Sequence, residues 1–79
     1  MEEHPLTGQR IDLEGDSVAW WPCHIGKEAK IGPGCSIGAL AHIGQRVEMG
    51  KACKIQGSAY IADECILGEG VFIGPSAVL

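Results

Sequence analysis

The chain lacks several features that mark common kinds of protein. It has no run of basic residues and a formal net charge of −4, so nucleic acid and anionic membrane surfaces are poor candidates as partners. No apolar stretch approaches the roughly 18 residues of a membrane-spanning helix. The N-terminal segment MEEHPLTGQR is acidic and polar, unlike a signal peptide. These absences predict a cytoplasmic protein that binds neither nucleic acid nor membrane.

What the chain does have is a six-residue repeat, present nine times without interruption from Ile25 to Val78. The hexads are IGKEAK, IGPGCS, IGALAH, IGQRVE, MGKACK, IQGSAY, IADECI, LGEGVF and IGPSAV. Position one is always Ile, Leu or Met, position two is Gly in seven of nine, and position five is always Ala, Cys or Val. Such regularity indicates a solenoid, in which each repeat packs only against its neighbours.

A period of six fits the alternation of β-strands and does not fit the face of a helix. Three hexads predict one triangular turn of 18 residues, with successive turns stacked as parallel strands about 4.8 Å apart. Gly at position two is expected to supply backbone freedom near the corners. The aliphatic residues at position one then form three inward ladders: Ile31, Met49 and Leu67; Ile37, Ile55 and Ile73; and Ile25, Ile43, Ile61 and Leu79.

The repeat can be followed backwards, less cleanly, through two hexads that begin at Leu13 and Ala19. The sequence therefore predicts an all-β domain over 13–79, a triangular prism of about 3.5 turns of 18 residues. Residues 1–12 are too irregular to assign to hexads and are expected to form an irregular N-terminal arm or a cap. Leu79 is position one of a new hexad, so we expect either that the chain is a fragment of a longer protein or that a partner covers this end.

Four cysteines in a short chain raise the alternatives of a disulfide framework or a zinc site. All four stand at position five of their hexads, where Ala and Val stand elsewhere: Cys23, Cys35, Cys53 and Cys65. This placement favours small buried thiols in a reducing compartment.

Charge is missing from one of the three groups of hexads. The hexads at 19–24, 37–42, 55–60 and 73–78 contain no Asp, Glu, Lys or Arg in 24 positions, and we take them to form one face of the prism. Its outward positions carry Trp20, Trp21, Leu40 and Gln56. Depletion of charge with aromatic enrichment is typical of an interface core, and an isolated domain of 79 residues gains from added burial. We therefore expect self-association through or beside this face, although a face that is merely uncharged is the alternative.

Position six of the same hexads forms a column of His24, His42, Tyr60 and Val78, which we expect at the corner beside the uncharged face. The two histidines are 18 residues apart, hence on neighbouring strands. A neutral imidazole there can accept a proton from an amine or hydroxyl near neutral pH. His24 beside the tryptophans is the better candidate for such a role, and an interface hydrogen bond is the alternative for His42. His4 lies in the arm and has no expected role.

The hexad rule aliphatic–Gly–x–x–small–x resembles that of the hexapeptide-repeat acyltransferases. The resemblance implies a left-handed parallel β-helix, a homotrimer, and acetyl-CoA bound between neighbouring prisms as the acyl donor. Over 13–79 the hexads are most similar to the sugar-nucleotide 3-amino N-acetyltransferases, through Trp20, His24, the Ile55-Gln56 pair and the Gly74-Pro75-Ser76 turn.

That resemblance implies roles for individual residues. His24 and His42 are the candidate catalytic residues, and Trp21, Gln56 and Tyr60 are the candidate contacts to the amino sugar. Gly74, Pro75 and Ser76 are the candidate contacts to acetyl-CoA. No metal is implied.

Three departures separate the chain from this subfamily. Trp20-Trp21-Pro22 replaces a Trp-His-Phe string, Gly57 stands where the subfamily has Asn, and the subfamily continues past the Gly-Pro-Ser hexad with further coils. These departures favour an alternative, a non-catalytic solenoid module for self-association or partner docking. A third reading, a zinc hydratase of the carbonic anhydrase kind with His24 and His42 as ligands, lacks a third histidine in place.

Overall fold

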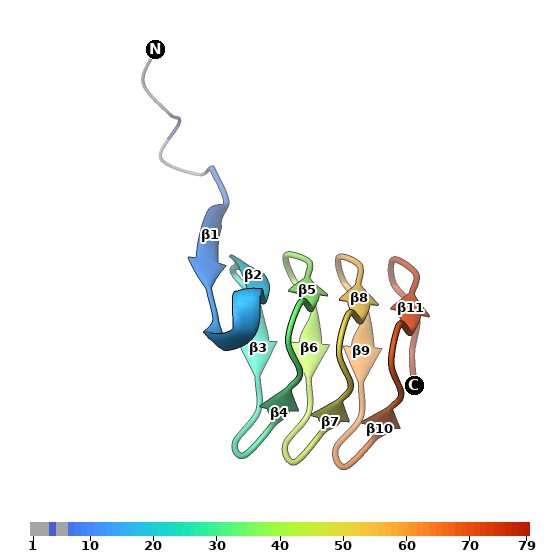
Figure 1. The fold of residues 1–79 in the computed structure, drawn as a ribbon. Coiled ribbons are helices and arrows are strands. Elements are labelled where there is room, and N and C mark those ends of the chain that lie inside the picture. The colour runs from blue at the N-terminus through green and yellow to red at the C-terminus, as the bar shows by residue number, and fades with distance from the viewer. Residues whose placement is uncertain (1–3, 5–6) are drawn as a thin grey trace.

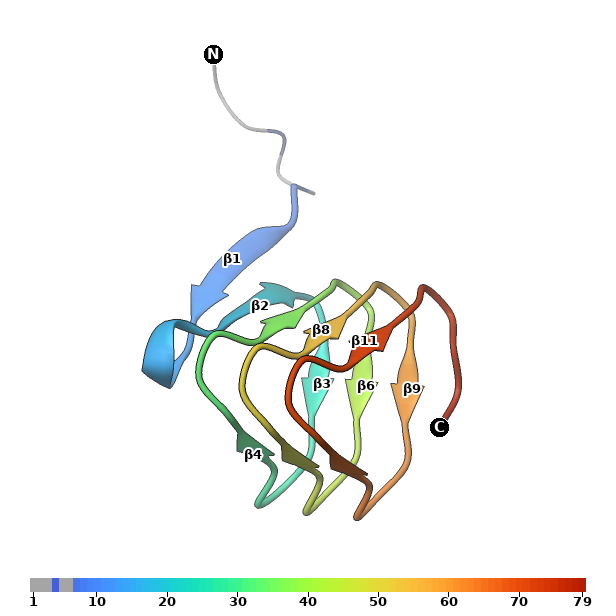
Figure 2. The same cartoon turned by 45° about the vertical axis from the view of Figure 1, so that its right-hand side comes forward.

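The computed structural model describes residue 4 and residues 7–79, which form a parallel β-solenoid of about three turns with an 18-residue repeat. Figure 1 shows the turns side by side, and Figure 2 shows the triangular path of each turn. The strands are β1 (Gln9–Asp12), β2 (Val18–Trp21), β3 (His24–Ile25), β4 (Lys30–Ile31), β5 (Ser36–Ile37), β6 (His42–Ile43), β7 (Glu48–Met49), β8 (Lys54–Ile55), β9 (Tyr60–Ile61), β10 (Ile66–Leu67) and β11 (Phe72–Ile73).

The strands form three sheets, one on each side of the prism. Sheet A has the order β1-β2-β5-β8-β11, sheet B the order β3-β6-β9, and sheet C the order β10-β7-β4. Apart from the antiparallel pair of β1 and β2, every pair is parallel and joins residues 18 positions apart, as in Ile43 opposite Ile61. The predicted all-β solenoid is thus confirmed.

The three aliphatic ladders are also confirmed, except that Leu79, the last member of the third ladder, is 47% exposed. Strand pairing places Ile31 beside Met49 and Leu67 in sheet C, and it places Ile37 beside Ile55 and Ile73 in sheet A. The ladder side chains of the middle turns are fully enclosed: Ile37, Ile43, Ile55 and Ile61 are 0–1% exposed. Small residues at position five fill the remaining space, among them Cys35, Ala41, Val47, Cys53 and Ala59.

The corners depend on position four of each hexad, rather than on position two as the sequence suggested. Residues at position four all have φ between 54° and 69°, and seven of the nine are not glycine: Glu28, Leu40, Arg46, Ala52, Ser58, Glu64 and Ser76. This left-handed conformation turns the position-four amide towards the preceding turn. There it donates to the position-three carbonyl, as Arg46 does to Lys27 at 2.9 Å.

Glycine at position two has a different purpose, which is to let the next turn approach. A Cβ atom added at Gly32 would lie 2.7 Å from the carbonyl carbon of Gly50, and one at Gly38 would lie 2.6 Å from the amide nitrogen of Gly57. Real Cβ atoms essentially never come within 3.0 Å of other heavy atoms. The spacing between turns therefore leaves no room for a Cβ atom at Gly32 and Gly38, whereas Gln56 occupies the same position of its hexad with a side chain.

Each hexad bends around a corner, because the left-handed residue lies in its middle. The strands consist of position six and the following position one, so the uncharged hexads run from sheet A around a corner to sheet B. The expected uncharged flat face is therefore a corner with its flanking strands. For the same reason the column of His24, His42 and Tyr60 lies on the strands of sheet B and not at a corner.

The N-terminal arm differs from the expectation over residues 9–12. These residues form β1, which pairs with β2 in the register Arg10 opposite Trp20 and covers the N-terminal edge of sheet A (Figure 1). An exposed edge strand needs such a cover. The expectation for residues 1–3 and 5–6 lies outside the described residues. A short 3-10 turn, η1 (Glu14–Asp16), links β1 to β2.

Candidate functional site

The candidate residues lie on one longitudinal strip of the prism. We define the neutral strip as the hexads 19–24, 37–42, 55–60 and 73–78, which cross the corner between sheets A and B. Backbone hydrogen bonds join these corners from turn to turn: the Leu40 amide donates to the Pro22 carbonyl at 2.6 Å, and the Ser76 amide donates to the Gly57 carbonyl at 3.0 Å. The strip is therefore continuous from the first turn to the last.

Three rings form a stacked column along the sheet B side of the strip. The ring centroids of His24 and His42 are 4.7 Å apart with an interplanar angle of 8°, and those of His42 and Tyr60 are 4.5 Å apart at 4°. The spacing follows from the strand pairing, which sets the three residues directly beside one another. Val78 continues the column through an isolated parallel bridge with Tyr60.

The column distinguishes the two histidines. His42 has a ring on each side and is half-buried, whereas His24 is stacked on one side only and is exposed. The imidazole of His24 is thus more accessible to a substrate than that of His42. His42 is placed to fix the orientation of its neighbours.

Apolar side chains lie exposed on the same strip. Trp21 is 57% exposed and Leu40 is 65% exposed, and Trp20 is also exposed at the end of β2. The chain between β2 and β3 carries Trp21 around the corner to His24, so the indole and the imidazole belong to the same end of the strip. An exposed apolar strip without charge is suited to contact with another molecule.

The other predicted contacts lie farther along the strip. Gln56 follows β8 and is half-buried, and its backbone amide donates a hydrogen bond to the Ile73 carbonyl at 2.9 Å. Gly74, Pro75 and Ser76 form the same corner one turn later, after β11. The structure therefore brings all the predicted site residues to one strip. The candidate contacts to acetyl-CoA lie in the last turn, and His24 lies in the first.

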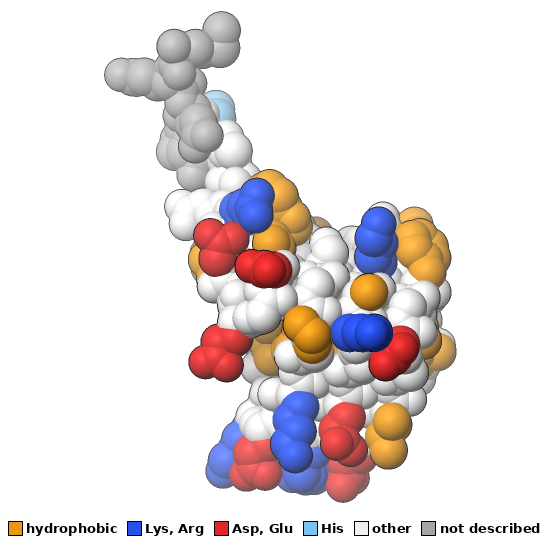
Figure 3. Space-filling view, viewed as in Figure 1, with side chains coloured by type: hydrophobic (Ala, Val, Ile, Leu, Met, Phe, Trp, Pro, Cys, Tyr) orange, Lys and Arg blue, Asp and Glu red, His pale blue; other side chains and the backbone are white. Residues whose placement is uncertain are grey.

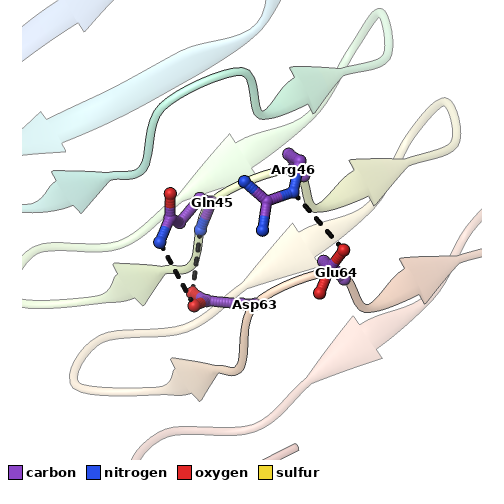
Figure 4. Close-up of polar contacts among 4 residues, drawn as sticks. All are labelled: Gln45, Arg46, Asp63 and Glu64. Carbon is purple, nitrogen blue, oxygen red and sulfur yellow. Dashed lines mark hydrogen bonds and ion pairs between the residues drawn. The ribbon is translucent and has the colours of Figure 1, made fainter.

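Charged side chains gather at a different corner, between sheets B and C. Figure 3 shows acidic and basic groups together below the strands of sheet C. The backbone amide of Gln45 donates a hydrogen bond to a carboxylate oxygen of Asp63 at 3.0 Å (Figure 4). The Nε of Arg46 lies 3.4 Å from a carboxylate oxygen of Glu64. A shallow open depression of about 240 Å³ is lined by Glu28, Lys30, Arg46 and Glu48.

This charged corner was not predicted from the sequence. Its signal was present as residues of opposite charge spaced by 18, as in Lys30 and Glu48, which the strand register places directly opposite each other. Residues that pair across a parallel ladder stabilise it modestly. The corner is accounted for by the contacts between turns.

Cys35 and Cys53 are buried on the hexads that join sheets C and A, away from the strip. Cys23 is half-buried in a hexad of the strip, and Cys65 is half-buried in a hexad that joins sheets B and C. The Sγ of Cys35 donates to the Gly50 carbonyl at 3.2 Å and that of Cys53 to the Gly68 carbonyl at 3.0 Å, as the hydroxyl of Ser17 does to Gly32 at 2.7 Å. Burial raises the pKa of the Cys35 and Cys23 thiols. Such thiols are poor nucleophiles, because the thiolate is the reactive form.

Three further observations bear on metal binding and membrane spanning. Over residue 4 and residues 7–79, no group of three or more His, Cys, Asp or Glu side chains is arranged to hold a metal ion. His24 and His42 are stacked with nearly parallel rings. In the same described part of the chain, no helix is long and apolar enough to cross a membrane.

Comparison with known families bears on the C-terminal half of the solenoid. Residues 46–79 match the family model described as bacterial transferase hexapeptide (six repeats). These residues are therefore similar to the repeats of that family. The preceding turns share the same strand register and the same left-handed corners, so the hexapeptide architecture extends to them. No significant match was found among curated proteins or solved structures.

Proposed function

We propose that the neutral strip is the site of an acetyl-CoA-dependent N-acetyltransferase, or of part of one, that acts on the amino group of a nucleotide-linked amino sugar. The observation that carries the proposal is His24, an exposed imidazole in the same hexad as two exposed tryptophans on an uncharged strip. The hexapeptide match over residues 46–79 supports a transferase of this kind.

The proposed reaction needs no covalent enzyme intermediate. The amine attacks the thioester carbonyl, the new C–N bond forms, and the C–S bond breaks to release CoA. The imidazole of His24 accepts the proton that the amine loses, and the thiolate of CoA is then protonated to the free thiol. Most of the acceleration comes from positioning the two substrates, and the base adds roughly 10²–10⁴-fold.

The remaining strip residues have supporting roles in this proposal. Trp21, Gln56 and Tyr60 contact the amino sugar, and Gly74, Pro75 and Ser76 contact acetyl-CoA. His42 is a positioning residue, because it stacks on His24 and Tyr60. Two neighbouring copies would flank each site in a homotrimer assembled through the strip, whose exposed Leu40 and Trp21 support such an assembly. We place the reaction in the cytoplasm as part of the same proposal.

The test is release of CoA thiol from acetyl-CoA in the presence of nucleotide-linked amino sugars. We expect His24→Asn to lower turnover by roughly 10²-fold or more, because the variant keeps a polar side chain whose amide cannot act as a base. His4→Asn is the matched control for loss of a histidine away from the strip, with unchanged turnover. Wild-type turnover in His24→Asn would remove His24 from the mechanism.

The second candidate is a non-catalytic module for self-association or partner docking. The exposed apolar side chains of the strip favour it as much as they favour a substrate site. Titration with CoA separates the two, since binding supports the transferase and no binding at millimolar concentration supports the module.

A further inference from the structure

The two substrates of the proposed reaction carry negative charge that the neutral strip does not balance. Acetyl-CoA and a nucleotide-linked sugar each contain a diphosphate, whereas the 24 positions of the strip contain no Lys or Arg. A charge held against an apolar surface is costly unless a group of opposite charge or a hydrogen bond compensates it. The proposed function therefore requires a cation beside the strip.

Lys54 on β8 is the cation that borders the strip. It is the only Asp, Glu, Lys or Arg residue in β2, β5, β8, β11 and the strands of sheet B, and it directly precedes the strip hexad 55–60. Arg10 on β1 is already paired with Asp12, at 3.1 Å. The other basic residues lie on sheet C or at the two corners beside it: Lys27, Lys30, Arg46 and Lys51.

The ammonium group of Lys54 has no acidic neighbour in its sheet. Strand register places Lys54 between Ser36 and Phe72, and neither is charged. The Lys54 side chain is exposed, and it makes no hydrogen bond or ion pair with residue 4 or residues 7–79. Lys30, by contrast, lies directly opposite Glu48 in sheet C. The positive charge of Lys54 is therefore available to a ligand.

The two neighbours of Lys54 add a hydroxyl group and an aromatic ring. Neighbouring strands lie about 4.8 Å apart, so Ser36, Lys54 and Phe72 form one row across the outer side of sheet A. Phe72 is 63% exposed and Ser36 is half-buried. Figure 3 shows basic and apolar side chains next to each other over β8 and β11. The row thus offers a hydrogen-bond donor, a cation and a flat apolar surface together.

We propose that Ser36, Lys54 and Phe72 bind the nucleoside diphosphate part of a substrate. The Lys54 ammonium binds the diphosphate as a point charge, and the Ser36 hydroxyl donates a hydrogen bond to a phosphate oxygen. The ring of Phe72 stacks on the base, as aromatic side chains do with nucleobases of any sequence. The proposal rests on the proposed function, because both proposed substrates carry this group, and it extends the site from the neutral strip onto sheet A.

Equilibrium binding of adenosine diphosphate, uridine diphosphate and inorganic pyrophosphate tests the row without any turnover. We expect Lys54→Gln to raise the Kd by roughly tenfold, as expected for the loss of one hydrogen bond to a charged group. Phe72→Leu should weaken binding of the nucleotides and not that of pyrophosphate, because only the ring is lost. Lys51→Gln is the matched control, since it removes the same charge at the corner between sheets C and A and should leave the Kd nearly unchanged. Circular dichroism checks that each variant is folded.

Steady-state kinetics then identifies the substrate that occupies the row. A higher KM for acetyl-CoA in Lys54→Gln, with kcat retained, assigns the row to the donor, and a higher KM for the amino sugar assigns it to the acceptor. Lys54-dependent binding of nucleotides without release of CoA thiol would contradict the proposed function alone and leave the row in place. Equal Kd values for the wild type and Lys54→Gln, an equal loss of binding in Lys51→Gln, or no binding of any probe would overturn the row.

Discussion

Replacing Gly32 by alanine tests the feature that sets the spacing between turns. The added methyl carbon would lie 2.7 Å from the carbonyl carbon of Gly50 and 2.8 Å from the carbonyl oxygen of Met49, where 3.4–4 Å is an ordinary contact. Both obstructing atoms belong to backbone, so no side-chain rotation relieves them. The two turns must therefore separate locally by about 0.7–1 Å, the gap to ordinary contact.

This separation breaks the hydrogen bonds that hold the corner. The Gly32 amide donates to the Met49 carbonyl at 2.9 Å, and the buried Ser17 hydroxyl donates to the Gly32 carbonyl at 2.7 Å. Overpacking costs typically about 1–3 kcal/mol and each lost hydrogen bond about 0.5–1.5 kcal/mol, so we expect Gly32→Ala to lower the free energy of unfolding by about 2–4 kcal/mol. For a domain of this size, that corresponds to a fall in Tm of at least about 10 °C.

Thermal unfolding followed by circular dichroism, at a concentration low enough to exclude association, measures the effect. Gly74→Ala is the matched control, because it occupies position two of the last hexad with no atom within 4 Å of its Cβ. There we expect no loss, or a gain of about 0.4–1 kcal/mol from the reduced entropy of the unfolded chain. Equal destabilisation by the two substitutions would refute the close-approach explanation of the repeat glycine.

The remaining predictions concern the thiols and the charged corner. Because burial raises the pKa of the Cys35 thiol, the folded state holds that proton more tightly than the unfolded state. This contribution to stability is therefore complete below pH 9.0, the ordinary thiol value, and is lost as the pH rises above it. Cys35→Ser, which keeps a hydrogen-bond donor, should flatten the alkaline part of the stability curve, and an unchanged curve would exclude Cys35 as its cause. Asp63→Ala should cost about 1 kcal/mol, since it removes the acceptor of the Gln45 amide. Glu64→Ala should change stability by less than about 1 kcal/mol, since its ion pair with Arg46 is exposed to solvent, and chemical denaturation that ranked the two in the opposite order would contradict this assignment.

Much of the fold could be predicted because the repeat is strict. The identity of the ladders, such as Ile37 beside Ile55, follows from a period of 18 once three hexads make a turn. The location of the corners could not be predicted in the same way. Left-handed residues at position four have no common side chain, since Glu28, Leu40 and Ala52 share only the backbone conformation.

The candidate site was predicted in its members but not in its shape. The stacking of His24, His42 and Tyr60 follows from their spacing, and the structure confirms that they are neighbours. Their place on the strands of sheet B, and the greater accessibility of His24, required the actual corner positions. Pairing of β1 with β2 also lay beyond the pattern, because residues 9–12 have no hexad.

The amino-acid sequence by itself determined a three-sided coil with an aliphatic interior and one strip free of charge, because a period of six fixes which residues point inward. The tertiary structure alone decided where each hexad bends and which glycines are indispensable. Those properties depend on atoms 18 residues away, since the backbone of one turn sets the room available to the turn before it.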